Sequence, residues 1–379
     1  MLNRQQIEPY RRGLRERERL SRAFRPGGRS ELYRYRPEAY APRGGTSWLT
    51  MAIAGAAVLG ATALAIAAAA RRAERLHPPR GRFVTVDGVR LHLIEQGDGE
   101  PVIFLHGNGA LAEDWVVSDV MQRTAAAGFR AIAFDRPGFG WSERPRGRDF
   151  DPEAQARLIR AACSQLGIER PVLVGHSWGT LVAIAMALDV PREVRGLVLI
   201  GGYYFPTART DVLLLSPPAI PVVGDILRYT VMPLLGRALR PLFTKRIFAP
   251  RPVPWRFRDR FPFSMTLRPS QIRATAADAA LMIPAAARLR SRYFALGVPT
   301  VLMAGTGDRI VHPGRQTMHL HRQLPNSVLH MVPEAGHMLH YLVPQQVVEA
   351  VCAVNEARGQ KPALAVADKA LAVSPSPAM

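Results

Sequence analysis

Short apolar runs alternate with longer mixed segments from about residue 82 to residue 356. The first two runs, 82–86 and 90–95, are separated by Asp87-Gly88, a dipeptide that favours a tight turn between antiparallel strands. Six later runs of strand length are almost continuously apolar: 101–105, 131–134, 172–174, 197–200, 300–303 and 328–332. Continuous apolar strands separated by helix-length segments indicate a mostly parallel sheet with helices on both faces. We therefore expect an α/β fold that opens with a hairpin and ends with a helix at 344–356.

One block breaks this alternation. Residues 203–296 are rich in proline and arginine and lie between two of the predicted strands, so we expect an inserted cap over the strand ends. The folded part then divides into a first core segment (76–202), the cap (203–296) and a second core segment (297–356). The Ala, Pro and Ser composition of 357–379 predicts a disordered tail.

The segment 44–70 contains 27 residues without a charge. As a helix it would extend roughly 40 Å, enough for the ~30 Å hydrocarbon layer of a membrane. We expect a single transmembrane helix, because the charged region before it (1–43) is too long for a cleavable signal. A buried helix remains the alternative, since alanine dominates the segment. Arginines flank both ends, so the charge distribution leaves the orientation open.

Charge and cysteine content narrow the possible functions. The net charge of +20 suggests nucleic-acid binding at first, but the excess is confined to the tail (1–43) and the cap, which holds 15 basic and 4 acidic residues. We therefore expect no nucleic-acid partner, with the arginine-rich tail as the one place to test. Only Cys163 and Cys352 are present, far apart in the chain, so neither a disulfide framework nor a cysteine metal site is expected.

A nucleophile motif follows the predicted strand at 172–174. The sequence Gly175-His176-Ser177-Trp178-Gly179 has the form G-x-S-x-G and precedes a helical run. At a strand-to-helix junction this pattern forms a sharp turn that presents the serine hydroxyl above the sheet edge. We expect Ser177 to be a nucleophile.

A serine nucleophile needs a histidine base and a carboxylate that orients it, so the downstream chain was searched in the order Ser, Asp, His. Asp308 and His337 each follow directly after an apolar strand, at the strand ends where sites collect in open α/β sheets. We choose His337 as the base and keep His340 as its rival. We expect His106 and His176 to pack and form hydrogen bonds.

The turn His106-Gly107-Asn108-Gly109 follows another strand and is rich in glycine. Its backbone N–H groups can face the serine. The amides of Asn108 and Trp178 are therefore expected to form an oxyanion hole.

These motifs, together with Asp135-Arg136-Pro137-Gly138-Phe139-Gly140-Trp141-Ser142, occur in the order found in the α/β-hydrolase fold family. The chain resembles its cap-bearing branch of serine esterases, lipases and carbon–carbon bond hydrolases over about residues 82–356. The resemblance implies a serine hydrolase without metal or organic cofactor. Relatives that open epoxides or remove halogen use aspartate as the nucleophile, so Ser177 argues against both activities.

The cap offers apolar runs, 212–215, 220–223 and 231–235, beside its basic residues. An apolar lining with a basic exterior suits an acyl ester that is taken from a membrane or carries an anionic group, and the alternative is an ordinary cap core with a solvated charged face. We expect a membrane-anchored serine hydrolase that cleaves a carboxylic ester through an acyl-enzyme. The alternatives are a carbon–carbon bond hydrolase with the same triad, or a ligand-binding member of the fold without activity.

Overall fold

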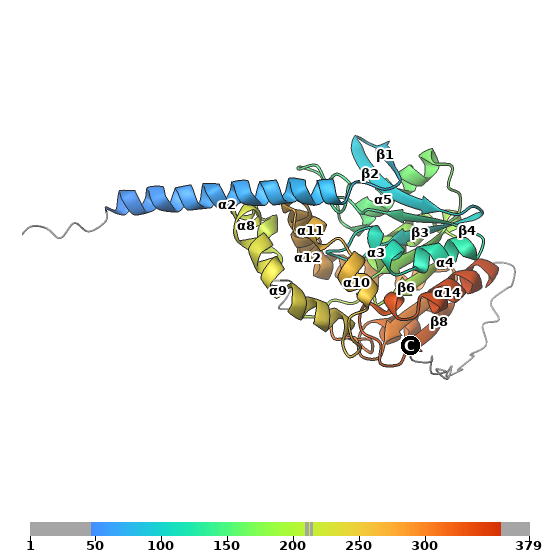
Figure 1. Ribbon diagram of the computed structural model, residues 1–379. Helices are drawn as coiled ribbons and strands as arrows, with labels where there is room; N and C mark the ends of the chain where they lie inside the picture. Colours follow the sequence, from blue (N-terminus) through green and yellow to red (C-terminus); the bar gives the residue numbers. More distant parts are fainter. Residues whose placement is uncertain (1–46, 209–211, 213–214, 358–379) are drawn as a thin grey trace, which may run out of the picture. The chain divides into compact units, whose positions relative to one another are not determined.

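The computed structural model describes residues 47–208, 212 and 215–357. It divides into two compact units, Met1–Ala54 and Gly55–Met379. In the first unit the described residues begin the long helix α2 (Trp48–Leu76), which continues into the second unit (Figure 1). The predicted tail 1–43, and the predicted tail 357–379 beyond its first residue, lie outside the described residues.

The second unit is built on an eight-stranded sheet with the order β1-β2-β4-β3-β5-β6-β7-β8. The hairpin β1–β2 and the β2–β4 pair are antiparallel, and all other neighbours are parallel. All eight strands predicted from the sequence are present. Their bounds are β1 (Arg82–Val86), β2 (Val89–Gln96), β3 (Glu100–Leu105), β4 (Phe129–Phe134), β5 (Val172–His176), β6 (Gly196–Ile200), β7 (Thr300–Gly305) and β8 (Ser327–Val332).

Helices cover both faces of the sheet, as the continuous apolar strands predicted. A separate hydrophobic core lies on each face of the sheet, and alternate residues of β3 point into them. Ile103 and Leu105 pack in the first core, and Val102 and Phe104 pack in the second. Helices α5 (Pro152–Gln165) and α6 (Gly179–Asp189) contribute to the first core. Helices α3 (Glu113–Val117), α4 (Val120–Ala126) and α14 (Pro344–Glu356) contribute to the second. The short helix α13 (Thr317–Gln323) lies between β7 and β8 in the chain.

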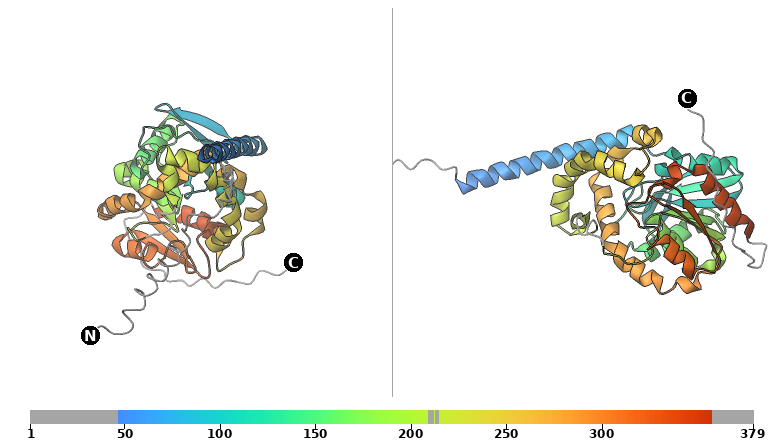
Figure 2. Two further views of the ribbon diagram at one scale, coloured as in Figure 1. Left: turned by 90° about the vertical axis from the view of Figure 1, so that its left-hand side faces the viewer. Right: turned by 90° about the horizontal axis from the view of Figure 1, so that it is seen from below.

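The cap is inserted between β6 and β7, where the sequence predicted it. Its helices gather on one side of the sheet in the views of Figures 1 and 2. Part of α12 joins the first core through Met282, Ala285 and Leu289. The cap helices are α8 (Val223–Tyr229), α9 (Val231–Phe248), α10 (Trp255–Arg260), α11 (Phe263–Thr266) and α12 (Pro269–Arg290).

Helix α2 has 29 residues and is long and apolar enough to cross a membrane. Most of its large apolar side chains, Trp48 and Leu64 among them, are exposed, and Ile66 is buried. The helix continues six residues beyond the predicted 44–70 segment, to Leu76. Within the second unit, the added turn makes specific contacts, because Ala73 is buried and Glu74 accepts a hydrogen bond from Arg268 at 2.9 Å.

Candidate active site

Ser177 stands at the turn between β5 and α6. Its φ of +51° lies in the left-handed region, which residues with a side chain rarely adopt. The Ser177 N–H donates to the Ile200 carbonyl at 2.9 Å, which ties the turn to the end of β6. A Cβ atom at Gly179 would overlap the Leu105 carbonyl oxygen, so glycine lets α6 start against β3. Strain held by the surrounding structure is typical of a nucleophile elbow.

His337 and Asp308 form a buried pair on the loops after β8 and β7. The His337 Nδ1–H donates to Asp308 Oδ2 at 2.8 Å. The other oxygen, Oδ1, accepts from the backbone N–H groups of Ile310 and Val311 at 2.8 and 2.9 Å. Because Nδ1 carries the proton in this arrangement, Nε2 is left as the basic atom.

The pair lies close to the elbow. The His337 ring centroid is 4.8 Å from that of His176, the residue that precedes Ser177. His176 Nε2–H donates to the His337 carbonyl oxygen at 3.1 Å. The fold therefore brings the three predicted triad residues, Ser177, Asp308 and His337, to one end of the parallel sheet.

The glycine-rich loop after β3 lies against the elbow. A Cβ atom at Gly107 would come within 3.1 Å of the Ser177 Cβ, so glycine permits this approach. Within the described part of the chain, the backbone N–H groups of Asn108 and Trp178 donate to no protein acceptor. Both amides are therefore free to bind an oxygen atom beside Ser177, as an oxyanion hole requires.

Arg136 holds the glycine-rich loop in place. Its Nε–H donates to the His106 carbonyl at 2.8 Å and its Nη2 to the Gly107 carbonyl at 3.1 Å. His106 Nε2 in turn accepts from the Arg136 backbone N–H at 3.0 Å. Burial lowers the pKa of His106 to about 4, so its imidazole is neutral at physiological pH. His106 therefore has the packing and hydrogen-bonding role expected from the sequence.

Asp278, on cap helix α12, joins the cap to this loop, and the sequence reasoning missed it. Its carboxylate accepts from Arg136 Nη1 at 2.6 Å and from Arg144 Nη1 at 2.7 Å, and Asp278 is fully buried. Its backbone carbonyl accepts from the Trp178 indole N–H at 2.9 Å. Burial lowers the pKa of Arg136, and the charge of Asp278 opposes that shift. The available signal was that Asp278 is one of four acids among 94 cap positions, inside an alanine-rich helix.

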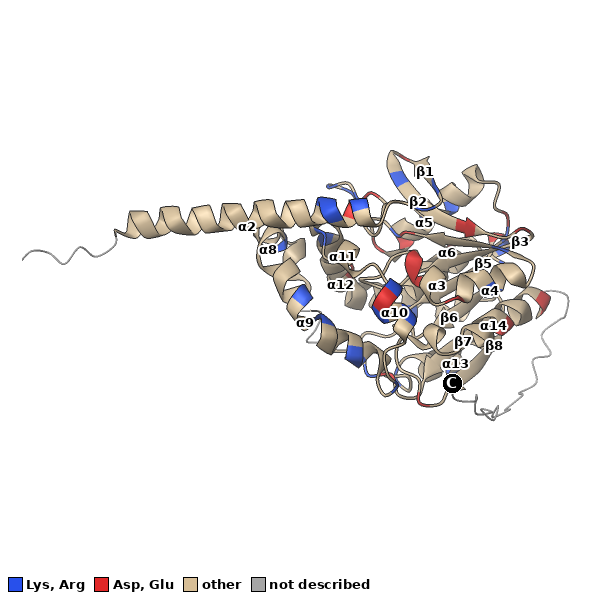
Figure 3. Ribbon diagram, viewed as in Figure 1, with Lys and Arg blue, Asp and Glu red and all other residues tan. Residues whose placement is uncertain are grey.

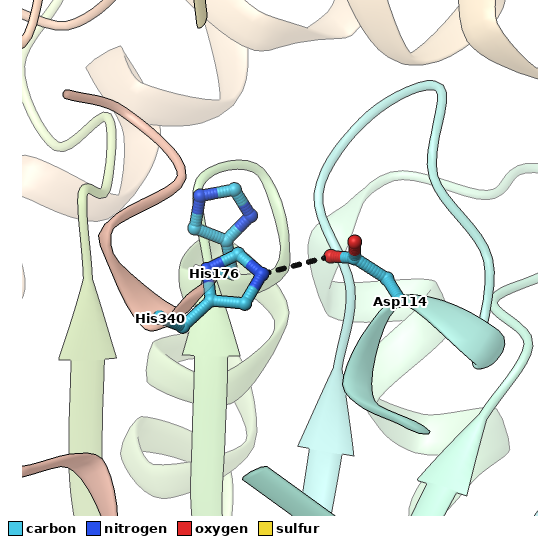
Figure 4. A group of neighbouring side chains, drawn as sticks. All are labelled: Asp114, His176 and His340. Carbon is cyan, nitrogen blue, oxygen red and sulfur yellow. Dashed lines mark hydrogen bonds and ion pairs between the residues drawn. The ribbon is translucent and has the colours of Figure 1, made fainter. Parts of the chain in front are cut away.

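The rival base His340 belongs to a different cluster, shown in Figure 4. Its Nε2 is 3.1 Å from Asp114 Oδ2, and the other Asp114 oxygen accepts from the Tyr341 hydroxyl at 2.7 Å. The His340 ring lies 4.6 Å from the His176 ring, and burial places the pKa of His176 well below its ordinary value. His340 is thus oriented by Asp114 and not by Asp308.

Asp114, His176 and His340 offer ligand atoms within 4.8 Å of one another, which is a pattern that suits a metal ion. Both Asp114 oxygens are engaged by protein groups, however, and His176 Nε2 is engaged by the His337 carbonyl. We therefore describe these residues as a hydrogen-bonded support under the His337 loop.

Comparison with known proteins agrees with this architecture. A family model described as "alpha/beta hydrolase fold" matches residues 100–344. The chain is 26% identical over 287 residues to haloalkane dehalogenase 2 of Mycobacterium tuberculosis, covering 73% of this chain and 95% of that protein. It is 27% identical over 262 residues to 2-hydroxy-6-oxo-2,4-heptadienoate hydrolase of Pseudomonas putida, covering 68% and 89%.

Two solved structures are similar in fold. A thermophilic esterase from Thermogutta terrifontis has a TM-score of 0.57 and 24% identity, and covers 72% of this chain and 97% of its own. A structure described as a membrane phospholipase A has a TM-score of 0.56 and 22% identity, and covers 83% and 97%. The family model spans more than half of the chain, and the sheet order and the loops at its strand ends agree with it. The chain therefore belongs to the alpha/beta hydrolase fold family.

Proposed function

We propose that this protein is a membrane-anchored serine hydrolase that cleaves a lipophilic carboxylic ester. The observation that carries the proposal is that Ser177, in a left-handed turn, follows His176, whose ring lies 4.8 Å from that of His337, and that the His337 Nδ1–H is bound by Asp308 at 2.8 Å. A serine hydroxyl becomes an effective nucleophile when an oriented imidazole removes its proton. Ser177 also argues against dehalogenation, because relatives that remove halogen use aspartate.

In the first half of the reaction, Ser177 Oγ attacks the ester carbonyl carbon and transfers its proton to His337 Nε2. The amides of Asn108 and Trp178 stabilise the oxyanion. The tetrahedral species then expels the alkoxide, which takes the proton from His337 and leaves as the alcohol. The Asp308 carboxylate stabilises the imidazolium while it carries the proton.

The second half repeats these steps with water. His337 removes a proton from water, and the hydroxide attacks the acyl-enzyme carbonyl. The oxyanion hole again holds the negative charge, and collapse breaks the bond to Ser177 Oγ. Ser177 recovers its proton from His337, and the carboxylic acid is released.

An apolar cluster beside these loops supports a lipophilic acyl group. Leu111 follows the glycine-rich loop and Met338 follows His337, and both pack with Phe248 and Phe257 of the cap. The same cluster contains Ile247 and Phe261. These residues are buried against one another, and the side chains beside the triad loops are therefore apolar, so we expect activity to rise with acyl length over a series of p-nitrophenyl esters. Activity confined to acetyl esters would contradict the lipophilic substrate.

The second candidate is carbon–carbon bond hydrolysis with the same triad. It is favoured by the 27% identity to the heptadienoate hydrolase over 68% of the chain. The ester series and a 2-hydroxy-6-oxo dienoate should be compared at equal enzyme concentration. We expect the larger kcat/KM for a medium- or long-chain ester. The reverse ranking would favour the second candidate.

Membrane anchoring is supported by α2, whose charge-free part, residues 48–70, is about 35 Å long by helix rise. The phospholipase structure, described as a membrane protein, also covers a larger share of this chain than the esterase. Full-length protein should remain in the membrane pellet after a carbonate wash. Release of intact chains into the supernatant would refute the anchor.

A further inference from the structure

Cap helix α9 has an apolar face that is exposed. Its apolar residues recur at 231, 234, 235, 238, 239 and 242, the spacing of one face of an α-helix. The exposed fractions are 57% for Leu234, 47% for Leu239 and 68% for Leu242. A surface helix normally turns such a face toward the core. Here the buried residues lie on the other side of the helix: Pro233, Thr244, Ile247 and Phe248.

Helix α8 extends this surface. Val223 and Ile226 are more than half exposed and precede the α9 residues in the chain. We call these side chains the α8–α9 apolar face: Val223, Ile226, Val231, Leu234, Leu235, Leu239, Leu242 and Phe243. Clustered exposure of this kind marks an interaction site in soluble domains. The arrangement also corrects an expectation, because 220–223 and, in the run 231–235, Val231, Leu234 and Leu235 are exposed where an apolar lining of the site was expected.

The charges around the face are mostly positive. Residues 223–248 contain five basic residues and one acidic residue, Asp225, which pairs with Arg146 and Arg228, so α9 itself is basic without an acidic residue. Figure 3 shows the basic positions along α9 without an acidic neighbour on that helix. Lys245 and Arg246 follow the α8–α9 apolar face at the C-terminal end of α9, where long basic side chains can reach lipid headgroups. A second copy of the chain would bring the same positive charge to a two-fold contact, which is unfavourable. An anionic lipid surface is complementary to it.

The face is connected to the candidate active site through the end of α9. Ile247 and Phe248 pack with Leu111 and Met338, which flank the glycine-rich loop and His337. The Met338 N–H also donates to the Ile247 carbonyl at 3.3 Å. A lipid surface that contacts the outer side of α9 would therefore lie one helix away from the loops proposed for catalysis.

We propose that the α8–α9 apolar face docks into the headgroup region of an anionic membrane. The inference rests on the proposed membrane location, and it names the class of surface from which the substrate is taken. Docking removes exposed leucines from water and places basic side chains at anionic headgroups. It gives the cap a membrane contact that is separate from α2.

Quenching by lipid tests the contact directly. Full-length protein carrying Cys352→Ser and Leu239→Cys, labelled with an environment-sensitive fluorophore, is reconstituted in phosphatidylcholine–phosphatidylglycerol vesicles that contain doxyl lipids. Cys163 is buried and its thiol pKa is raised to about 12, so it should not react with the label. The control places the label at exposed Gln122 on α4. We expect quenching and a shift of emission to shorter wavelength at position 239 only.

Activity provides a second readout. Leu239→Glu should lower hydrolysis of a vesicle-borne ester on the order of tenfold, by the transfer free energy of one leucine, and leave hydrolysis of a soluble short ester unchanged. Arg237→Ala, a change outside the α8–α9 apolar face, should lower the vesicle rate less.

Absence of quenching at 239 in protein that co-floats with vesicles would overturn the docking proposal while leaving the anchor intact. A shift to shorter wavelength that grows with the number of protein molecules per vesicle, without quenching by doxyl lipid, would indicate that a second copy of the chain covers the face. That result would also overturn the docking proposal. Failure to co-float, with normal hydrolysis of the soluble ester, would overturn the anchor and the docking together but not the serine chemistry.

Discussion

At the scale of single residues, two histidines three positions apart have different partners. His337 is bound by Asp308, and His340 is bound by Asp114. We expect His337→Ala to lower kcat by several orders of magnitude, and Asp308→Asn to lower it by about 10⁴, because each loses a function of the triad. His340→Gln should keep most of the activity of the folded fraction. Steady-state kinetics normalised to the concentration of folded protein will distinguish the effects of these variants. An inactive but folded His340→Gln variant would show that the base is misassigned.

Two other histidines make stability dependent on pH. Burial lowers the pKa of His106 from 6.5 to about 4 and lowers that of His176 well below its ordinary value. Between pH 6.5 and 4 the unfolded chain binds more protons than the folded chain, so the free energy of unfolding falls as pH falls. For His106 alone the loss is roughly 3 kcal/mol across this window.

Urea titrations at several pH values measure this slope. His106→Gln should reduce it, whereas His312→Gln, at an exposed position, should leave it unchanged. A slope that does not differ between the wild type and the His106 variant would mean that His106 is not neutral in the folded protein.

At the scale of elements, one buried carboxylate adds a charged link between α12 and the core. Asp278 pairs with both Arg136 and Arg144, whose side chains are 0% and 8% exposed. Asp278→Asn should destabilise the protein by about 3–5 kcal/mol, because it leaves buried positive charge without compensation. Asp225→Asn is a matched control on α8, where the carboxylate is one-third exposed and pairs with Arg146 and Arg228. We expect less than about 1 kcal/mol there, measured by chemical denaturation. Equal costs for the two variants would contradict the structural role of Asp278.

Elements with a strong local pattern could be predicted from the sequence. The strand 172–174 is continuously apolar because both faces of β5 are covered, and the glycines beside Ser177 reflect a turn too tight for side chains. Asp278 could not be found in this way, because its two arginine partners are more than 130 positions away in sequence. The outward turn of α9 was also unpredictable, since helical periodicity defines a face but not its direction.

At the scale of the whole molecule, the hydrolase unit begins earlier than the sequence pattern indicated. The expected boundary was residue 76, but Ala73 is buried and Glu74 binds Arg268, whose side chain is 6% exposed. A chain that starts at Arg71 should therefore be more stable than one that starts at Leu76, by roughly 1–3 kcal/mol, because the shorter chain leaves Arg268 without its acid. Denaturation of the two truncated proteins measures the difference. Equal stability would show that the last turn of α2 is dispensable.

The central claim is that Ser177 forms an acyl-enzyme, and covalent trapping tests it most directly. Full-length protein in vesicles is treated with a fluorophosphonate, digested, and analysed by mass spectrometry, with Ser177→Ala as the matched control. We expect one adduct per chain, on the peptide that contains Ser177, and none in the folded Ser177→Ala protein. Labelling that persists in that variant, or wild-type protein that is folded and never labelled, would contradict it.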